Sequence, residues 1–564
     1  MKQVVVIMIS LLISTNVLAQ INPIDRIQNN QQRLIDEEFR RRELDNALRQ
    51  PTVEKAITKT SENEDMPAGG CINIKKMEIT GNDTICTNCI DEASADYIGK
   101  CLTLVDIDKM LQDITNYYIK KGYITSRAYM SMPQNRIKDG ILEIKIIEGK
   151  VSKIEGLKKG ESLTAFPSIA DKILNIRDVE QGLDQINRLP SNQTTMDIKA
   201  DEEINDHSKI IISNQPKGRT GVTFFGDNAG SESTGETRFG LRASQDNLLG
   251  LNDQIYMTYT KSPSQDHTHR NANSFALGMS MPFGYWTLTN NFSWSNYRTS
   301  FVLINGDRFY SYGNSTTNDI SLDRLLFRGQ SFKISAGGGF TYKTNSNYTR
   351  VLDLKIKNEV SSRDLSIIHF DLPTTLYTPI GVFYFKPSYV QGVRAFDTLR
   401  DKDYSYSQKA QYKAWKLYAY YTKYFGPVNY TTAFDGQYTK DEMFGSEAFF
   451  IGGEYTVRGF KEDSFQGDNG YAWRNDLSAN LGNVFNSENV VLQSLTPCLF
   501  MDYGYAHSNN KNIKSEILSG AGAKIDINYK FFDASISYAE PLKKPDWMKE
   551  NHVWYLYAGM SFRF

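Results

Sequence analysis

Two short segments place a charged residue among apolar neighbours. The motif V-R-G-F at 457–460 holds one cation, and F-M-D-Y-G at 500–504 holds one carboxylate in an alternating strand pattern. A buried arginine needs an acceptor, because an unpaired charge away from water is costly. We therefore predict that Arg458 pairs with Asp502 and pins a loop, which is structural rather than catalytic chemistry. The residues singled out are Gly452, Gly453, Val457, Arg458, Gly459 and Phe460 in the loop, and Phe500, Asp502 and Gly504 in the strand.

Four of the 5 cysteines, Cys71, Cys86, Cys89 and Cys101, are close together in the sequence. In an oxidising compartment they would form disulfides, for which four cysteines allow three pairings. The Cys86-x-x-Cys89 spacing also suits zinc, but zinc normally takes two such pairs, and Cys71 and Cys101 are not so spaced. We favour disulfides, with Cys71–Cys101 and Cys86–Cys89 as the preferred pairing and zinc as the alternative.

Signatures of common enzymes are missing from the sequence, which contains no G-x-S-x-G, no H-E-x-x-H and no P-loop. The 6 histidines are scattered, at His207, His267, His269, His369, His507 and His552. We therefore expect no catalytic residue, no cofactor and no bound metal, and we do not expect an enzyme.

The composition limits the class of protein. The net charge is −1, which gives no indication of a nucleic-acid partner. The mean hydropathy of −0.46 is too polar for a bundle of membrane helices, and no apolar run after the N-terminus is long enough to span a bilayer as a helix. The chain nevertheless has 33 Tyr, 30 Phe and 40 Gly. A polar average with many aromatics is typical of a transmembrane β-barrel, in which lipid-facing and lumen-facing residues alternate.

The N-terminal region divides into three segments. Residues 1–19 have the short positive start, apolar core and small residue at the end (Ala19) of a cleaved signal peptide. Residues 20–50 contain a helix candidate, Pro23 to Arg49, with polar residues on nearly every side. Such a helix must lie in water or in a wet cavity, so it is either a surface helix or a plug in a hydrated pore. Residues 51–70 form a polar linker.

Two compact β-α-α-β-β modules follow, at 71–149 and 150–216. In the first, the apolar spacing predicts a strand from Ile72 to Ile79, a helix over Asp106–Lys121, and strands over Ile124–Met132 and Ile141–Ile147. In the second, it predicts a strand over Val151–Ile154, a helix that starts at Asp178, and strands over Thr195–Ala200 and Lys209–Ser213.

Helical periodicity disappears from residue 217 to 564, and segments of period two replace it. Trp286, Leu288, Phe292 and Trp294 alternate with Thr287, Thr289, Asn291 and Ser293, for example. At roughly 20–22 residues per strand and connection, this length predicts about sixteen strands, enough to enclose an aqueous channel. Phe562 and Phe564 end the last strand and the chain, and we interpret them as a C-terminal barrel signal.

With these motifs the chain resembles the transporter (TpsB) family of two-partner secretion, of the haemolysin and adhesin secretion-activation type. V-R-G-F matches that family's sixth-loop motif and F-x-D-x-G its strand motif. Cys71-Ile-Asn-Ile and Lys100-Cys101-Leu resemble its first polypeptide-transport-associated (POTRA) domain. That family carries Cys at the positions of Cys71 and Cys101. Cys86 and Cys89 depart from its pattern.

The resemblance implies an α+β periplasmic region with an N-terminal helix and two POTRA domains, followed by a 16-stranded transmembrane barrel in the bacterial outer membrane. The helix would plug the pore at rest, and Arg458 would hold its loop in the lumen by bonding Asp502. The implied partners are an unfolded secreted exoprotein (TpsA type), the lipid bilayer and, during biogenesis, the barrel-assembly machinery. The transporter would be a monomer that exports its cargo and, as in some relatives, activates it.

Strand edges of the second module are candidate sites for capturing that exoprotein by β-augmentation. The candidate residues are Thr195 and Ile198 on one strand and Ile210 and Ile212 on the other. Three other classes of function compete with this prediction. A barrel-assembly factor normally carries more POTRA domains and no plug helix. An outer-membrane enzyme would need a catalytic motif, and a passive porin would not need two periplasmic modules. The sequence favours a haemolysin-type cargo over an adhesin or a contact-dependent toxin.

Overall fold

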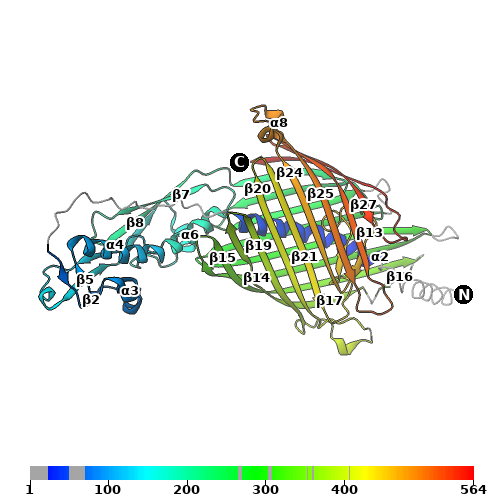
Figure 1. Ribbon diagram of the computed structural model, residues 1–564. Coiled ribbons are helices and arrows are strands. Elements are labelled where there is room, and N and C mark those ends of the chain that lie inside the picture. Colours follow the sequence, from blue (N-terminus) through cyan, green and yellow to red (C-terminus); the bar gives the residue numbers. More distant parts are fainter. Residues whose placement is uncertain are drawn as a thin grey trace.

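The computed structural model describes residues 23–49, 70–263, 270–302, 308–351, 354–358, 361–405 and 407–564. Two small α/β modules stand at one end of a closed β-barrel, and a helix lies inside that barrel (Figure 1). This arrangement confirms the predicted fold class. The predicted signal peptide, most of the linker, His267 and His269 lie outside the described residues. No helix in the described ranges combines the length and apolar character that a membrane crossing requires.

The first module is a three-stranded sheet with two helices. Its strands β2 (Lys76–Thr80), β5 (Ile141–Ile147) and β4 (Arg127–Met130) lie in that order, and β2 is parallel to β5. The helices are α3 (Thr87–Ser94) and α4 (Leu104–Lys120). The prediction of one strand from Ile72 to Ile79 was wrong. Ile72–Asn73 forms a separate strand, β1, paired with β3 (Cys101–Leu102), because the Ile74 amide turns to the Lys100 carbonyl.

The sequence sets both ends of α4. Thr103 caps its N-terminus: its backbone N–H donates to Asp106 Oδ2 over 2.9 Å, and the Asp106 N–H donates to its hydroxyl over 3.2 Å. The Thr103 hydroxyl also donates to Asp106 Oδ2, over 2.7 Å, and this bond together with that from the Thr103 N–H holds the pKa of Asp106 below its usual range. Gly122 follows the helix with a φ of +102°, the left-handed conformation that ends many helices. Between these ends, Ile107, Met110, Ile114 and Tyr118 face the module core.

The second module repeats this plan. Its strands are β6 (Lys150–Glu155), β8 (His207–Asn214) and β7 (Thr194–Ala200), in that order. Its helices are α5 (Lys159–Ala165) and α6 (Ile176–Asn187), and α6 buries Val179, Leu183 and Ile186. The central strand is therefore β8, paired with β6 on one side and β7 on the other. The prediction that Ile210 and Ile212 lie on a free edge was wrong, because both belong to β8 and are buried.

An antiparallel barrel of long strands forms the rest of the described chain. β16, β17 and β18 all pair along β15 and so are segments of one strand, which gives sixteen strands in the described residues. The strands are β9 (Thr220–Asp227), β10 (Arg238–Asp246), β11 (Gln254–Pro263), β12 (Asn271–Phe283), β13 (Trp286–Val302), β14 (Arg308–Arg328), β15 (Phe332–Val351), β16 (Leu354–Lys357), β17 (Arg363–Asp371), β18 (Thr374–Thr378), β19 (Gly381–Val393), β20 (Lys413–Phe425), β21 (Val428–Thr439), β24 (Asn469–Ala479), β25 (Leu495–His507), β26 (Glu516–Tyr529), β27 (Phe532–Lys543) and β28 (Val553–Arg563).

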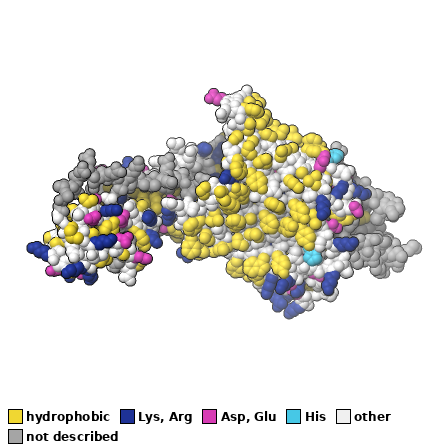
Figure 2. Space-filling model, in the orientation of Figure 1, with side chains coloured by type: hydrophobic (Ala, Val, Ile, Leu, Met, Phe, Trp, Pro, Cys, Tyr) yellow, Lys and Arg dark blue, Asp and Glu magenta, His cyan; other side chains and the backbone are white. Residues whose placement is uncertain are grey.

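The barrel closes where its first and last strands meet. β9 pairs with β28 from Asp227–Tyr557 to Gly221–Arg563, and Thr220 exchanges two backbone hydrogen bonds with Phe564. The alternating pattern of the sequence sets the two faces of the wall. Trp286 and Leu288 are about two-fifths exposed on the outside, and Figure 2 shows hydrophobic side chains as a broad belt across the visible face of the barrel. The wall thus meets the requirement of a lipid-exposed barrel, an apolar exterior without an open strand edge.

Helix α2 (Pro23–Leu48) runs along the inside of the barrel (Figure 1). Because its polar residues are distributed all round it, it lacks an apolar stripe for a conventional core. Inside the barrel it meets a polar wall instead, and it contacts strands β12, β13, β14 and β19.

Candidate functional site

Arg458 stands at the centre of a buried ion network inside the barrel. Its Nε lies 2.6 Å from Asp502 Oδ2, and its Nη2 lies 2.6 Å from Asp502 Oδ1, so that the two groups form a fork. Nη2 also lies 2.6 Å from Asp476 Oδ1 on the neighbouring strand. The guanidinium covers the Phe500 ring at 3.7 Å from its centroid. Asp502 is 0% exposed and Arg458 4%, so each charge depends on the other.

The loop that carries Arg458 joins β21 to β24, and we call residues 440–468 the arginine loop. It contains the short hairpin β22 (Phe449–Ile451) and β23 (Phe465–Gly467). Val457 and Phe460 are fully buried in one apolar cluster with β22 and the barrel strands. Tyr555 on β28 donates to the Phe460 carbonyl over 2.9 Å. Packing and ion pairing therefore both hold this loop to the wall.

Glycines allow the arginine loop to lie this close. A Cβ at Gly504 would stand 2.6 Å from a methyl carbon of Val457, and one at Gly459 would stand 2.9 Å from the Glu540 backbone. Gly459 also has a φ of +103°, which side chains rarely adopt. Gly452 and Gly453 have positive φ angles as well, at the turn after β22.

At the outer end of the arginine loop, Glu550 accepts the backbone N–H groups of Lys461, Glu462 and Asp463 over 2.8–2.9 Å. Burial raises the pKa of Glu550, and these three hydrogen bonds oppose that rise. Asp463 in return accepts the Lys549 N–H over 2.6 Å. The arginine loop is thus tied to the connection between β27 and β28 as well as to the wall.

The charged side chains of α2 pair with the barrel wall. Arg40 lies 2.8 Å from Asp435, and Glu38 lies 3.4 Å from Arg242. Glu43 accepts hydrogen bonds from Tyr384 over 2.6 Å and from Lys386 over 2.9 Å. Two cavities, of about 660 Å³ and about 590 Å³, adjoin the helix and are lined largely by polar side chains. The helix therefore occupies the lumen through polar contacts and leaves wet space beside it.

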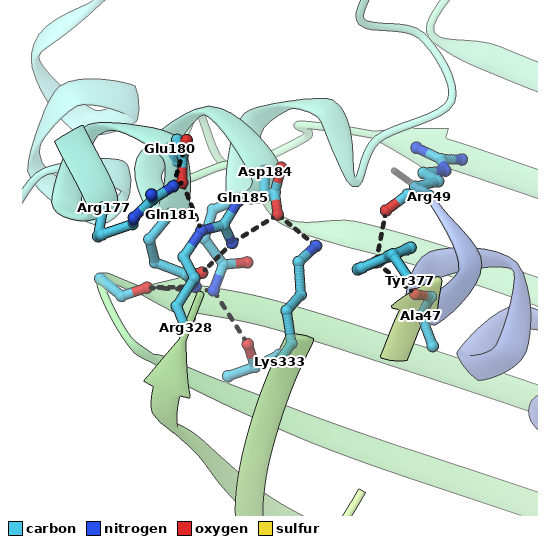
Figure 3. Close-up of polar contacts among 12 residues, drawn as sticks. Ala47, Arg49, Arg177, Glu180, Gln181, Asp184, Gln185, Arg328, Lys333 and Tyr377 are labelled. Atoms are coloured by element: carbon cyan, nitrogen blue, oxygen red, sulfur yellow. Dashed lines mark hydrogen bonds and ion pairs between the residues drawn. The ribbon is translucent and has the colours of Figure 1, made fainter. Parts of the chain in front are cut away.

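A second polar cluster, drawn in Figure 3, joins α6 of the second module to the barrel. Asp184 lies 2.8 Å from Arg328 and 2.6 Å from Lys333, and Glu180 lies 3.2 Å from Arg328. The Arg328 side chain is only 2% exposed. Gln185 donates to the carbonyl of Gly284, in the turn between β12 and β13, over 3.1 Å. Helix α6 is therefore docked on the barrel by charge-assisted hydrogen bonds.

This cluster also reaches the C-terminal end of α2 (Figure 3). The hydroxyl of Tyr377 on β18 lies 3.0 Å from the Ala47 carbonyl oxygen and 2.8 Å from that of Arg49. Arg49 in turn donates to the Asn187 carbonyl at the end of α6. Lys333 lies 5.6 Å from the centroid of the Tyr377 ring. We call the set Arg49, Asp184, Arg328, Lys333 and Tyr377 the junction, because module, barrel and α2 meet there.

No pattern in the sequence predicted the junction. Its members lie on or directly after five elements, α2, α6, β14, β15 and β18, and Asp184 and Arg328 are 144 residues apart. In the sequence, each of them has the features of an ordinary exposed polar residue. Tyr377 lies in a predicted barrel strand, but nothing in the sequence around it distinguishes it from the other tyrosines among the 33 of the chain.

The remaining predicted residues have definite places. Disulfides join Cys71 to Cys101 and Cys86 to Cys89, with Cα–Cα distances of 5.2 and 5.3 Å. Phe562 stacks on Phe531 with ring centroids 5.6 Å apart, and Phe564 is 72% exposed at the barrel rim. Thr195 and Ile198 lie on β7, which pairs only with β8 among the described residues.

Comparison with known proteins agrees with this architecture. Residues 206–527 match the family described as haemolysin secretion/activation protein ShlB/FhaC/HecB. Residues 72–149 match the ShlB-type POTRA domain, and 143–200 match a further POTRA domain. The outer membrane transporter CdiB of Dickeya dadantii is 30% identical over 96% of this chain and 96% of its own.

Two further relatives extend the comparison. The hemolysin transporter protein ShlB of Serratia marcescens is 28% identical over 80% of this chain and 78% of its own. The solved structure of CdiB from Escherichia coli, 28% identical, superposes with a TM-score of 0.84 and covers 96% of this chain and 100% of its own. This chain therefore belongs to the haemolysin secretion/activation family, as an outer-membrane transporter of two-partner secretion whose POTRA domains face the periplasm.

Proposed function

We propose that α2 plugs the barrel at rest and that the unfolded exoprotein crosses the lumen after α2 has left it. The observation that supports this proposal is the position of α2 inside a closed barrel, paired to the wall through Arg40 and Glu43. Because these contacts are polar and adjoin wet cavities, water can replace them when the helix leaves. A plug held by an apolar face would have no comparable substitute.

In this proposal the arginine loop stays in place while α2 moves. Arg458 serves to keep that loop folded against the wall, with Asp502 and Asp476 as its acceptors. The glycines at 459 and 504 serve the same end by allowing close approach. The lumen would then keep one constant wall, along which the cargo slides.

No chemical step is part of the proposed function. Export draws its direction from the cargo itself, because folding outside the cell removes the emerged segment from the equilibrium. We propose a haemolysin-type exoprotein as cargo. The family description and the name of the Serratia marcescens relative support this choice. The exoprotein encoded beside this gene is the one to test first.

We propose further that β7 captures the cargo in the periplasm by adding it as a strand. The Asp201 N–H donates to the His207 carbonyl across the β7–β8 ladder. Odd-numbered residues of β7 therefore direct their backbone N–H and C=O groups toward β8. Ile198 is even-numbered, and so its backbone N–H points to the free edge. Ile198→Pro removes that donor without breaking the ladder and should weaken cargo binding, whereas Ile198→Ala keeps the donor and serves as the control. Equal binding by both variants would exclude β7 as the capture site.

We propose that the transporter works as a monomer and that the barrel-assembly machinery recognises its last strand. Closure of the barrel by β9 and β28 of the same chain supports the first statement. The exposed Phe564 at the rim supports the second. Replacing Phe564 with Ser should lower the amount of assembled barrel in the outer membrane, and unchanged assembly would exclude that role.

A reversible tether tests the plug. Cysteines replacing Arg40 and Asp435, whose side chains are in contact, can be joined by a bifunctional methanethiosulfonate reagent, which would tie α2 to β21 through two reducible disulfides. A linker is needed because cysteine side chains are much shorter than the arginine that spans this contact. We expect cross-linked cells to retain the exoprotein and reductant to restore its secretion. Each single-cysteine variant and the parent protein, given the same reagent and reductant, control for labelling and for reduction of the POTRA disulfides. Normal secretion by the cross-linked protein would disprove the proposal that α2 must leave.

A further inference from the structure

One connection at the periplasmic end of the barrel is built unlike its neighbours. The turns after Phe283, Phe425 and Tyr529 are only a few residues long, whereas residues 480–494 fold into two short helices between β24 and β25. These helices are α7 (Leu481–Val484) and α8 (Val490–Ser494).

Internal hydrogen bonds fix the shape of this connection. The side chain of Asn480 caps α7 and that of Asn489 caps α8. Asn480 also donates to the Gln493 carbonyl over 2.6 Å, and Gln493 donates to the Ser487 carbonyl over 2.8 Å. The two helices therefore present a defined surface.

That surface exposes four apolar side chains beside its polar residues. Phe485 is 65% exposed, Val490 60%, Val491 61% and Val484 42%. Glu488 is the one charged residue between 480 and 494. Four exposed apolar side chains on so small an element mark a contact surface, because leaving them in water is unfavourable.

The patch continues the lipid-facing wall of the barrel. Leu477 on β24 and Leu499 on β25 are 47% and 63% exposed on the strand segments that flank this connection. Tyr424 and Phe425, 71% and 54% exposed, lie at the same end of the barrel, where the aromatic girdle of a membrane barrel is expected. Figure 1 places α8 beside the wall at the end where the C-terminus lies, projecting away from the barrel. Figure 2 shows the hydrophobic belt extending toward this projection.

We infer that α7 and α8 form an interfacial anchor that inserts Phe485, Val490 and Val491 into the periplasmic leaflet of the outer membrane. The occupant of the patch is thus lipid, at the boundary between head groups and acyl chains where amphipathic elements bind. The anchor holds the periplasmic ends of β24 and β25, the two strands that carry Asp476 and Asp502.

Depth measurement on the full-length protein tests this anchor. A nitroxide label on Val491→Cys, in phosphatidylethanolamine–phosphatidylglycerol vesicles, reports whether oxygen from lipid or a nickel chelate from water reaches it. Leu499→Cys supplies the lipid reference and Ile204→Cys, in the turn after β7, the water reference. Cys498 is buried, and the unmodified protein measures its background labelling.

We expect the Val491 label to collide mainly with oxygen, as the Leu499 label does. Collision mainly with the chelate, as at Ile204, would overturn the anchor. A label shielded from both reagents would overturn it too, because the patch would then contact protein, either a second copy or a periplasmic partner.

A second set of variants guards against misfolding. With Phe485→Ser and Val491→Ser introduced together, a label on Val490→Cys should collide less with oxygen and more with the nickel chelate. The barrel should still stay folded in sodium dodecyl sulfate that has not been heated. An unchanged label depth in a barrel that stays folded would also overturn the anchor. No cargo takes part, and this outcome is therefore independent of the secretion assay.

Discussion

The arginine loop and the junction hold charges in opposite ways. At Arg458 one cation meets two carboxylates beside an apolar cluster, and every partner belongs to the barrel or to its own loop. At the junction the charges connect three separate bodies, and none of the apolar clusters among the described residues spans them. The Asp184 side chain there is 22% exposed, against 0% for Asp502.

This difference separates a fixed part from a releasable one. Separating a buried pair leaves two desolvated charges, so the arginine loop resists displacement. At the junction the Asp184–Lys333 pair is partly exposed, at 22% and 16%, so water can take the vacated positions at a much smaller cost. We therefore propose that the loop is a constant part of the wall and that the seam between the POTRA domain and α2 can open. Three substitutions test this division, in order of decreasing effect.

The largest effect is expected at Arg458. Arg458→Ala leaves the buried Asp502 unpaired, which costs about 3–5 kcal/mol. The closed strand ladder does not depend on that pair, so we expect the barrel to assemble while the loop loosens and secretion falls. Protease cleavage within residues 440–468 and secreted exoprotein measure the two consequences.

Lys461→Ala is the matched control for Arg458→Ala, because Lys461 lies in the same loop and pairs with an exposed partner, Glu236. Arg458→Lys should give an intermediate result, since an ammonium cannot form the fork with Asp502. Secretion at the parent level from Arg458→Ala would show that the loop needs no fixed position.

The second effect concerns docking of the POTRA domain. Asp184→Asn removes the charge shared by Arg328 and Lys333, and hydrogen bonds to charged groups contribute about 1.5–3 kcal/mol. Arg328 keeps Glu180, so we expect the lower part of that range. Hydrogen exchange along α6 should rise. Asp197→Asn, an equal charge change at a 63% exposed side chain of the same domain, should leave it unchanged. If both variants exchange alike, the junction does not dock the domain.

The sequence predicted the fixed part better than the releasable part. The sixteen strands follow from period-two runs that each segment carries by itself. Arg458 and Asp502 stand in local motifs whose chemistry demands a partner, so their pairing could be proposed from residue type alone. The Cys71–Cys101 disulfide was likewise predicted, from the oxidising compartment and from the resemblance to the transporter family.

Features that depend on the order of strands in space could not be predicted in this way. The apolar pattern of β8 fits an edge strand or a central one, and only its pairing with β6 shows that Ile210 and Ile212 are covered. Lys333 and Asp184 meet because a POTRA helix rests on a barrel strand 149 residues away. The split between β1 and β2 depends on a tertiary hydrogen bond from Ile74 to Lys100.

The smallest effect is expected at Tyr377, where barrel and plug meet. Tyr377→Phe keeps the ring and removes the hydroxyl that bonds the end of α2. One such hydrogen bond contributes about 1 kcal/mol, which corresponds to roughly fivefold more frequent opening in planar bilayers. Tyr389→Phe, whose lost hydroxyl bonds Gln391 on the same strand, should leave opening unchanged.

Combining Tyr377→Phe with Asp184→Asn sharpens this comparison. Lys333 stands between the two residues, so contacts coupled through it should give a double variant that opens less often than the product of the single effects. Effects that multiply would mean that the two contacts oppose opening without coupling. An Asp184→Asn variant that opens as often as the parent would mean that the POTRA domain and the plug release separately. An unchanged open probability in Tyr377→Phe would instead place the resistance to opening along Arg40 and Glu43, further back in the C-terminal half of the helix.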